Sequence, residues 1–192
     1  MTPTIPSTTH ALKEWQVAVH ALEQGEQALL LRKGGIRETG GKFTVEHDRV
    51  LLYPTYEHQQ PRFLKPEYAD RVEPVASGWH PETVRIGSWA MITEIFQVTN
   101  AERVADLSLY HIWTAEFIAD RLKWKPSQPL YVLLLRTYRL NHPQQIDYTP
   151  EYGGCRSWID LLTPIDLSDS QVVLSDREYD LQVERIRAIV GG

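Results

Sequence analysis

The sequence predicts an α+β fold: a single domain with a mixed or antiparallel sheet, flanked by an N-terminal helix, a middle helical layer and a C-terminal helix. The chain has 192 residues, a usual length for one domain with one core. Short apolar runs of strand length alternate with segments of helical periodicity. Hydrophobic residues make up 42% and charged residues 23%, as in globular proteins. We therefore expect residues 11–192 to form one globular domain after a disordered N-terminal tail, residues 1–10.

Each predicted helix has a local start or stop signal. A glycine after an apolar helical face ends a helix, and a Ser or Thr three residues before a Glu forms a capping box that begins one. The signals are Gly25 after the helix at residues 11–23, Thr99 with Glu102 before the helical layer that continues through residues 114–122, and Ser175 with Glu178 before the C-terminal helix.

The predicted strands are short apolar runs bounded by Gly, Pro or charged residues. The run at residues 130–140 is too apolar at its centre to be other than an interior strand. The full set is residues 28–31, 42–45, 50–53, 83–98 as two strands that meet near Gly87, 130–140 and 155–161.

Charge and cysteine content limit the classes of function. A net charge of -5 argues against strong non-specific attraction to nucleic acid or to anionic lipid. The single cysteine, Cys155, cannot form an intramolecular disulfide, which fits a reducing compartment. The first residues lack the pattern of a signal peptide, and no apolar stretch approaches the roughly 18 residues of a membrane span. We therefore expect a cytoplasmic protein that does not contact a membrane.

Several motifs of catalysis are missing from the sequence. It contains no G-x-x-x-x-G-K-S/T loop for a triphosphate and no G-x-G-x-x-G that opens a helix. It also lacks H-E-x-x-H, C-x-x-C and G-x-S-x-G. No Asp or Glu stands two residues before a Lys, the half-site of many metal-dependent nucleases. We predict neither a cofactor nor a metal site, and a binding module is favoured over an enzyme.

The densest group of candidate residues lies between positions 31 and 60. Glycines can bring the backbone close to a ligand, and Arg and Lys donate well to phosphate or carboxylate. The alternative is an ordinary hairpin turn with solvated charges. The candidate binding residues here are Arg32, Lys33, Gly34, Gly35, Arg37, Lys42, Arg49, Tyr53 and His58.

A second group interleaves basic and aromatic residues on the long apolar strand and before it. Bases stack on aromatic rings while Arg and Lys hold phosphates, so this composition suits single-stranded nucleic acid. The alternative is that the Arg side chains cap a sheet and the Tyr rings are half-buried. The candidates are Arg136, Tyr138 and Arg139, with Trp124, Lys125 and Tyr131 nearby.

Two other classes of function stay open. A metal- or His-dependent hydrolase would use His47, Asp48 and His58, because imidazole and carboxylate groups serve as ligands or as a general base. A hydrolase could instead use Cys155 as a nucleophile, since Arg156 beside it would favour the thiolate. The third class is a protein-binding assembly factor that uses exposed aromatic residues.

Four stretches of the chain resemble a bacterial family known only as domain of unknown function 1802, and this resemblance covers nearly the whole chain. It implies no activity. The stretches are ALLLRKGGIRE at residues 28–38, FTVEHDRVLLYPTYEHQ at 43–59, RLKWKPSQPLYVLLLRTYRL at 121–140 and YGGCRSW at 152–158.

A weaker resemblance links the chain to the ASCH group of PUA-like domains. Gly25, Gln27 and Arg32 stand where that group has G-x-K-x-x-E-x-R, but Gln27 replaces the Lys and Leu30 replaces the Glu. The order of the elements is also similar. The resemblance implies a PUA-like small barrel and a partner that is RNA or a modified nucleotide. Together the observations favour a binding module for single-stranded or structured nucleic acid or for a small anionic molecule.

Overall fold

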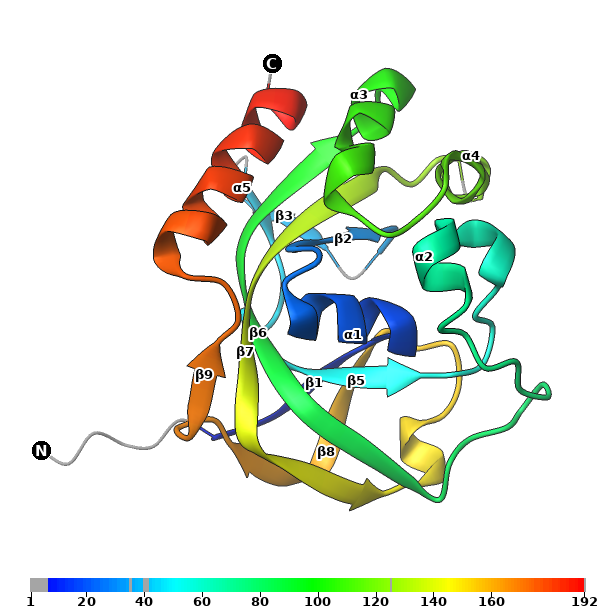
Figure 1. Cartoon of the computed structure of the whole chain (residues 1–192), viewed down its shortest axis with the longest axis vertical. Coiled ribbons are helices and arrows are strands. Elements are labelled where there is room, and N and C mark those ends of the chain that lie inside the picture. Colours follow the sequence, from blue (N-terminus) through cyan, green and yellow to red (C-terminus); the bar gives the residue numbers. More distant parts are fainter. Residues whose placement is uncertain (1–6, 35, 40–41, 125, 192) are drawn as a thin grey trace, which may run out of the picture.

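The computed structural model describes residues 7–34, 36–39, 42–124 and 126–191, and Figure 1 shows their arrangement. The fold is α+β and forms a single domain, as the sequence predicts. A mixed seven-stranded sheet runs in the order β2-β7-β6-β5-β1-β8, and β9 pairs with β7 outside this path. The strands are β1 (Ser7–Trp15), β2 (Leu29–Arg32), β5 (Arg49–Thr55), β6 (Thr83–Val98), β7 (Leu130–Asp147), β8 (Trp158–Asp166) and β9 (Ser170–Val172), while β3 (Arg37–Thr39) and β4 (Lys42–Thr44) form a separate hairpin.

The sheet is strongly curved but open. Strands β6 and β7 are long, pair over most of their length, and bend around the middle of the molecule (Figure 1). In the part of the chain that the structure describes, β2 and β8 end the hydrogen-bonded path and do not pair with each other, so the sheet does not close into the small barrel that the sequence resemblance implied. Strands β1 and β5 are parallel, and the other pairs are antiparallel.

The helices fill the hollow of the sheet and cover its upper end. Helix α1 lies in the centre of Figure 1, and α3, α4 and α5 lie above it in that view. None of the helices that the structure describes is long and apolar enough to cross a membrane. The helices are α1 (Gln16–Gln24), α2 (Pro66–Ala69), α3 (Ala101–Asp106), α4 (Ala115–Lys123) and α5 (Asp176–Val190), with short 3-10 turns at Pro61–Phe63, Leu107–Tyr110 and Pro150–Tyr152.

Alternation along the strands divides the buried side chains between two cores. Leu12 of β1 and Leu52 of β5 face the larger core, which also holds α1 and the buried side of α5. Their neighbours Ala11 and Leu51 face the smaller core with Tyr53. Side chains of a strand point to opposite faces in turn, so this central part of the sheet is covered on both faces.

The expectation of one N-terminal helix at residues 11–23 is wrong in its first half. Residues 7–15 form β1, and the helix begins only at Gln16. Residues 7–10, expected in a disordered tail, belong to the same strand. Strand β1 pairs with β5 on one side and with β8 on the other. These tertiary pairings outweigh the helical spacing of the apolar residues, because helix propensity is a weak preference.

Other boundaries differ from the sequence prediction in smaller ways. The segment at 83–98 is one strand, β6, and its register shifts between Ile86 and Ser88, so Gly87 marks a bulge and not a turn. The side chain that caps α3 is that of Asn100, one residue after the predicted Thr99. The capping box of Ser175 is confirmed.

Candidate functional site

A cleft of about 890 Å³ opens where strands β1, β2 and β5 end. The parallel strands β1 and β5 lie side by side in register, with Trp15 opposite Thr55, so their carboxyl ends reach the same edge of the sheet. The loop at 78–81, the end of α4 and the segment at 148–157 complete the walls. Segments from across the whole sequence therefore meet in this cleft.

Aromatic side chains dominate the walls of the cleft. On the α4 side, Phe117 stacks on Trp113 at 5.2 Å between ring centroids and meets Trp15 edge-on at 5.8 Å. On the opposite side, Tyr53 meets Tyr152 edge-on, also at 5.8 Å. These contacts fix the rings before any ligand arrives, as a stacking site requires.

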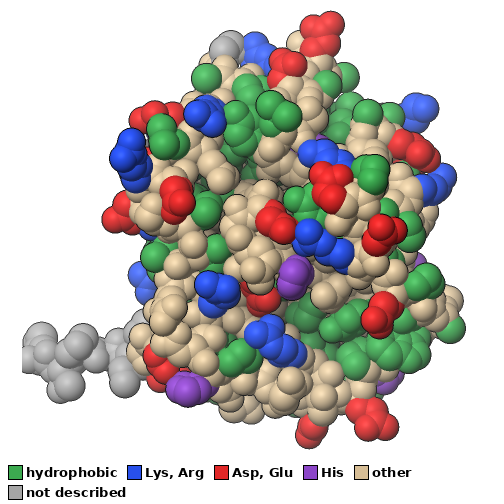
Figure 2. Space-filling view, in the orientation of Figure 1, with side chains coloured by type: hydrophobic (Ala, Val, Ile, Leu, Met, Phe, Trp, Pro, Cys, Tyr) green, Lys and Arg blue, Asp and Glu red, His purple; other side chains and the backbone are tan. Residues whose placement is uncertain are grey.

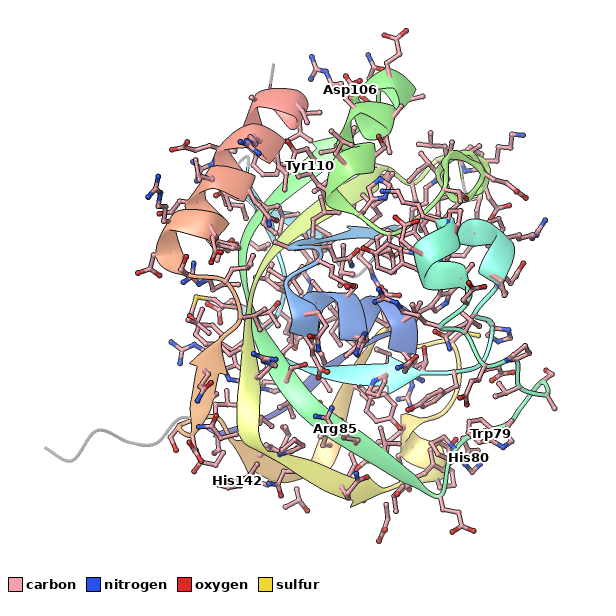
Figure 3. All side chains as sticks on the ribbon, in the orientation of Figure 1. Trp79, His80, Arg85, Asp106, Tyr110 and His142 are labelled. Carbon is pink, nitrogen blue, oxygen red and sulfur yellow. The ribbon has the colours of Figure 1, made fainter. Side chains whose placement is uncertain are left out.

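Two tryptophans of the cleft remain open to solvent. Trp79 is 44% exposed and Trp124 is 46% exposed, although large apolar side chains are normally buried. Trp79 packs edge-on against Tyr56 at 5.7 Å between centroids. Figure 3 places Trp79 beside His80 in the loop before β6, and Figure 2 shows hydrophobic side chains gathered over the same region. Exposed rings that are held in place offer platforms for a planar ligand.

The loop that carries Trp79 is held by Glu57. The backbone N–H of Gly78 donates to Glu57 Oε1 at 2.7 Å, and the Ser77 hydroxyl donates to the same atom at 3.2 Å. The first of these bonds keeps the pKa of the Glu57 carboxyl below its usual value. At neutral pH the carboxylate is therefore charged and anchors the loop.

Five Lys and Arg side chains line the cleft, and Arg32 forms an ion pair with a carboxylate in the cleft wall. Arg32 Nη1 donates to Glu14 Oε2 at 2.7 Å, and both side chains are largely buried. The other basic residues in the lining are Lys13, Lys33, Arg121 and Arg156.

The pKa shifts in the cleft follow from burial and from like charges. Burial lowers the pKa of the Lys13 ammonium, and the positive charge of Arg156 lowers it further. Burial also lowers the pKa of the Arg121 guanidinium. Burial raises the pKa of the Tyr53 hydroxyl, which therefore stays a neutral donor. A cleft that keeps cations partly desolvated favours an anionic ligand.

The first group of predicted binding residues is only partly brought together. Arg32, Lys33, Gly34, Tyr53 and His58 line the cleft. Gly35 and the side chain of Lys42 lie outside the described residues. The remaining two lie elsewhere: Arg37 on the β3–β4 hairpin, 3.6 Å from Glu46, and Arg49 at a second hollow.

The second group of predicted binding residues lies outside the cleft. Arg136 forms an ion pair with Asp176 of α5, and its guanidinium lies over the ring of Tyr179. Tyr138 stacks on Trp89 at 4.2 Å between centroids. Arg139 is exposed in the part of β7 that pairs with β9. Helix α5 therefore engages Arg136, and none of these three side chains lines the cleft.

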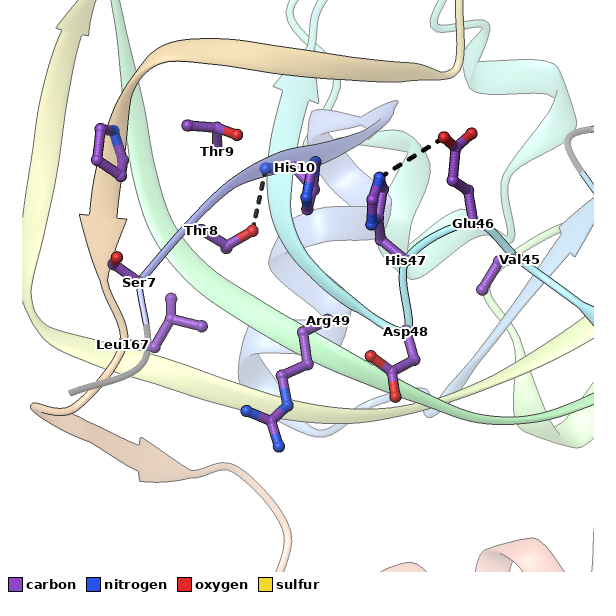
Figure 4. A pocket seen from close by; sticks show the side chains of 11 residues that line it. Ser7, Thr8, Thr9, His10, Val45, Glu46, His47, Asp48, Arg49 and Leu167 are labelled. Atoms are coloured by element: carbon purple, nitrogen blue, oxygen red, sulfur yellow. Dashed lines mark hydrogen bonds and ion pairs between the residues drawn. The ribbon is translucent and has the colours of Figure 1, made fainter. Parts of the chain in front are cut away.

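A second, shallower hollow contains His47 and Asp48 (Figure 4). The ring of His47 stacks on that of His10 at 3.2 Å between centroids, and His10 Nδ1 lies 2.6 Å from Asp160 Oδ1. His58 lines the cleft instead, so the hydrolase set of His47, Asp48 and His58 does not converge. Among the described residues, no three His, Cys, Asp or Glu side chains are placed to hold a metal ion.

Sequence reasoning missed much of the cleft. Lys13 falls in the segment predicted as a helix, and Arg121 is not among the predicted binding residues. Cys155, which is exposed, lines the cleft beside Arg156. The available signal was composition, because the chain contains six Trp and nine Tyr. The other aromatic residues that were missed are Trp15, Tyr56, Trp79, Trp113, Phe117, Tyr148 and Tyr152.

Comparison with known proteins gives a family and distant structural likenesses. None of the curated proteins matches the chain. Among solved structures, the ASCH protein of Zymomonas mobilis has a TM-score of 0.43 at 12% identity, covering 91% of this chain and 93% of its own. Two single-residue variants of that protein have TM-scores of 0.44 and 0.45, at 12% and 11% identity, and cover 94% and 91% of this chain and 98% and 96% of their own.

The four sequence stretches that suggested a family lie within one continuous match. A family described as "Domain of unknown function (DUF1802)" matches residues 11–185, which include β1 to β9 apart from the first residues of β1, and most of α5. The chain therefore belongs to the DUF1802 family.

Proposed function

We propose that the chain is a binding module whose cleft holds an anionic ligand with planar rings, of the nucleotide class. The observation that carries this proposal is that held aromatic rings and unneutralised cations line the same cleft. The rings of Tyr56, Trp79 and Trp124 are the stacking platforms. Lys13 and Arg156 bind an anionic group. The cleft volume of about 890 Å³ is in the range of sites that enclose small molecules.

The charge distribution favours binding at one local site over binding through a broad basic surface. The net charge of the chain is -5, and acidic and basic side chains are interspersed on the face in Figure 2. Non-specific attraction to a polyanion is therefore weak. Binding must come from contacts inside the cleft, where aromatic stacking does not depend on net charge.

The proposal is tested by tryptophan fluorescence, with ligands that carry a base and ligands that lack one. Titration with AMP or a tetra-adenylate should change the emission, whereas ribose 5-phosphate and an abasic tetranucleotide should bind much more weakly. Stacking on one aromatic side chain contributes about 1–3 kcal/mol per base. Trp79→Ala should therefore weaken binding by about tenfold.

Trp89→Phe is the matched control, because Trp89 stacks on Tyr138 outside the cleft. This variant should bind as tightly as the wild type. If the ring-free ligands bind as well as those with bases, or if Trp79→Ala binds normally, the proposed function is wrong.

A further inference from the structure

Three cations of the cleft, Lys13, Arg156 and Arg121, fall into two groups. In the first, Lys13 Nζ donates to the backbone oxygens of Tyr152 at 2.6 Å and of Gly154 at 2.9 Å. Arg156 donates to the backbone oxygen of Glu151. Among the described residues, neither cation lies within 4.0 Å of a carboxylate oxygen. Backbone carbonyls hold these two charges in place without cancelling them.

The second group is centred on Arg121 of α4. Its guanidinium lies over Phe117 at 4.9 Å and over Trp124 at 5.7 Å from the ring centroids. No described carboxylate lies within salt-bridge distance of Arg121 either. Arg32 stands nearby, but Glu14 neutralises it. Arg121 is therefore a positive charge on an aromatic wall.

The two groups lie on different walls of the cleft. Lys13 and Arg156 are held by backbone oxygens of the segment at 151–154. Arg121 lies over the rings of Phe117 and Trp124, in α4 and directly after it. Trp15 and Phe117, in edge contact, connect β1 to the wall that carries Arg121. A ligand that meets both groups must carry two anionic groups that stand apart.

We propose that the cleft takes a single strand of nucleic acid, with one phosphate at Lys13 and Arg156 and a second at Arg121. This inference rests on the proposed function and names its ligand. A mononucleotide has one phosphate position and meets only one group. The two phosphates of a nucleoside diphosphate are adjacent, so we expect this ligand to meet one group as well. In a strand, the phosphates are spaced by sugars, and the bases between them stack on Trp79 and Trp124.

The test compares ligands that differ in the number and spacing of phosphates, at several salt concentrations. Each neutralised phosphate of a single strand adds about 0.7 to the slope of log affinity against log salt. A tetranucleotide should show a slope of about -1.4 or steeper, so its affinity falls about sevenfold or more between 50 and 200 mM salt. AMP and ADP should bind more weakly, and AMP should show about half that slope.

Two variants locate the phosphates. The double variant Lys13→Gln with Arg156→Gln and the single variant Arg121→Gln each remove all the cations of one phosphate position, so each should reduce the slope for the tetranucleotide by about 0.7. For AMP, only one of the two should matter. Arg121→Lys keeps the charge and should keep the slope, and Arg185→Gln on the exposed side of α5 should change nothing. RNA and DNA tetranucleotides of the same sequence show which sugar the cleft prefers.

The outcomes separate this inference from the proposed function. If AMP or ADP binds as tightly as the tetranucleotide, or if Arg121→Gln leaves the slope unchanged, the two-phosphate inference is wrong while a nucleotide site remains. If no ligand with a base changes the tryptophan emission, the proposed function fails as well. The comparison of wild-type ligands decides the question even if one variant does not fold.

Discussion

Arg32 illustrates how a basic side chain in a cleft can serve the fold instead of the ligand. It is 13% exposed, its partner Glu14 is 9% exposed, and Glu14 Oε1 also accepts from the backbone N–H of Trp15. Leaving one member of a buried pair without its partner costs more than the pair itself contributes, because the remaining charge is desolvated. We therefore treat Arg32 as a positioning residue for the floor of the cleft.

Arg32→Ala is expected to lower the free energy of unfolding by about 3 kcal/mol. Urea unfolding monitored by circular dichroism measures this. The control is Arg37→Ala, which removes an ion pair whose two side chains are 73% and 69% exposed, and should cost less than about 1 kcal/mol. Equal stability losses in the two variants would contradict the assignment.

His111 makes the fold sensitive to acid. It is 3% exposed, and burial lowers its pKa from 6.5 to about 4, with a smaller effect from the Lys65 charge. Its Nδ1 accepts from the backbone N–H of Trp113 at 3.2 Å, which requires the neutral ring. The unfolded chain takes up the proton first as the pH falls. The neutral ring therefore contributes stability that is complete above pH 6.5 and is lost as the pH falls through 4.

The variant His111→Asn should remove this dependence, because the Asn oxygen can accept the same hydrogen bond but does not titrate in this range. Between pH 7 and pH 4, the wild type should lose about 3 kcal/mol more stability than the variant. Parallel stability profiles of the two proteins across this interval would show that His111 is not the titrating group.

At the level of elements, helix α4 links the fold to the cleft. Thr114 caps it by accepting from the backbone N–H of Phe117, and the helix then carries Phe117 and Arg121 into the cleft wall. Helix α5 has an equally clear start, the capping box of Ser175, but supplies no residue to the cleft lining. Removing the N-cap of each helix therefore distinguishes an effect on stability alone from an effect on ligand binding.

Thr114→Ala and Ser175→Ala should each cost about 1 kcal/mol of stability, since each removes an N-cap. Only Thr114→Ala should also weaken binding of the tetranucleotide, because fraying of the first turn of α4 displaces the Phe117 ring beneath Arg121. Thermal unfolding and fluorescence titration of both variants give the two quantities. A similar loss of affinity in Ser175→Ala would indicate a general effect of instability.

At the level of the whole molecule, local signals predicted most elements but not the cleft. The C-terminal helix, the strand at 29–32 and the interior strand β7 follow from capping and apolar runs that act within a few residues. Strand β1 was mistaken for a helix because its partners β5 and β8 are distant in sequence. Pairing across such distances leaves no local pattern to read.

The contrast between local patterns and long-range pairing also explains which site residues could be predicted from the sequence. Arg32, Lys33 and Tyr53 belong to a dense basic and aromatic stretch, so composition alone selected them. Lys13 and Arg156 are 143 positions apart in numbering, and the β1–β8 pairing and the hydrogen bonds of Lys13 to residues 152–157 bring their segments together. Conversely, Arg136 looked like a ligand contact because the sequence does not reveal that α5 covers it.

The most direct test of the account is a map of the binding surface by nuclear magnetic resonance. A single-stranded tetranucleotide is titrated into isotope-labelled protein, and the amide and tryptophan indole N–H signals are followed. We predict shifts for Trp79, Trp124 and the segments around Lys13 and Arg156, and none for α5 or for the His10 and His47 hollow. Shifts centred on Arg136 and Arg139, with the cleft signals unchanged, would contradict the account.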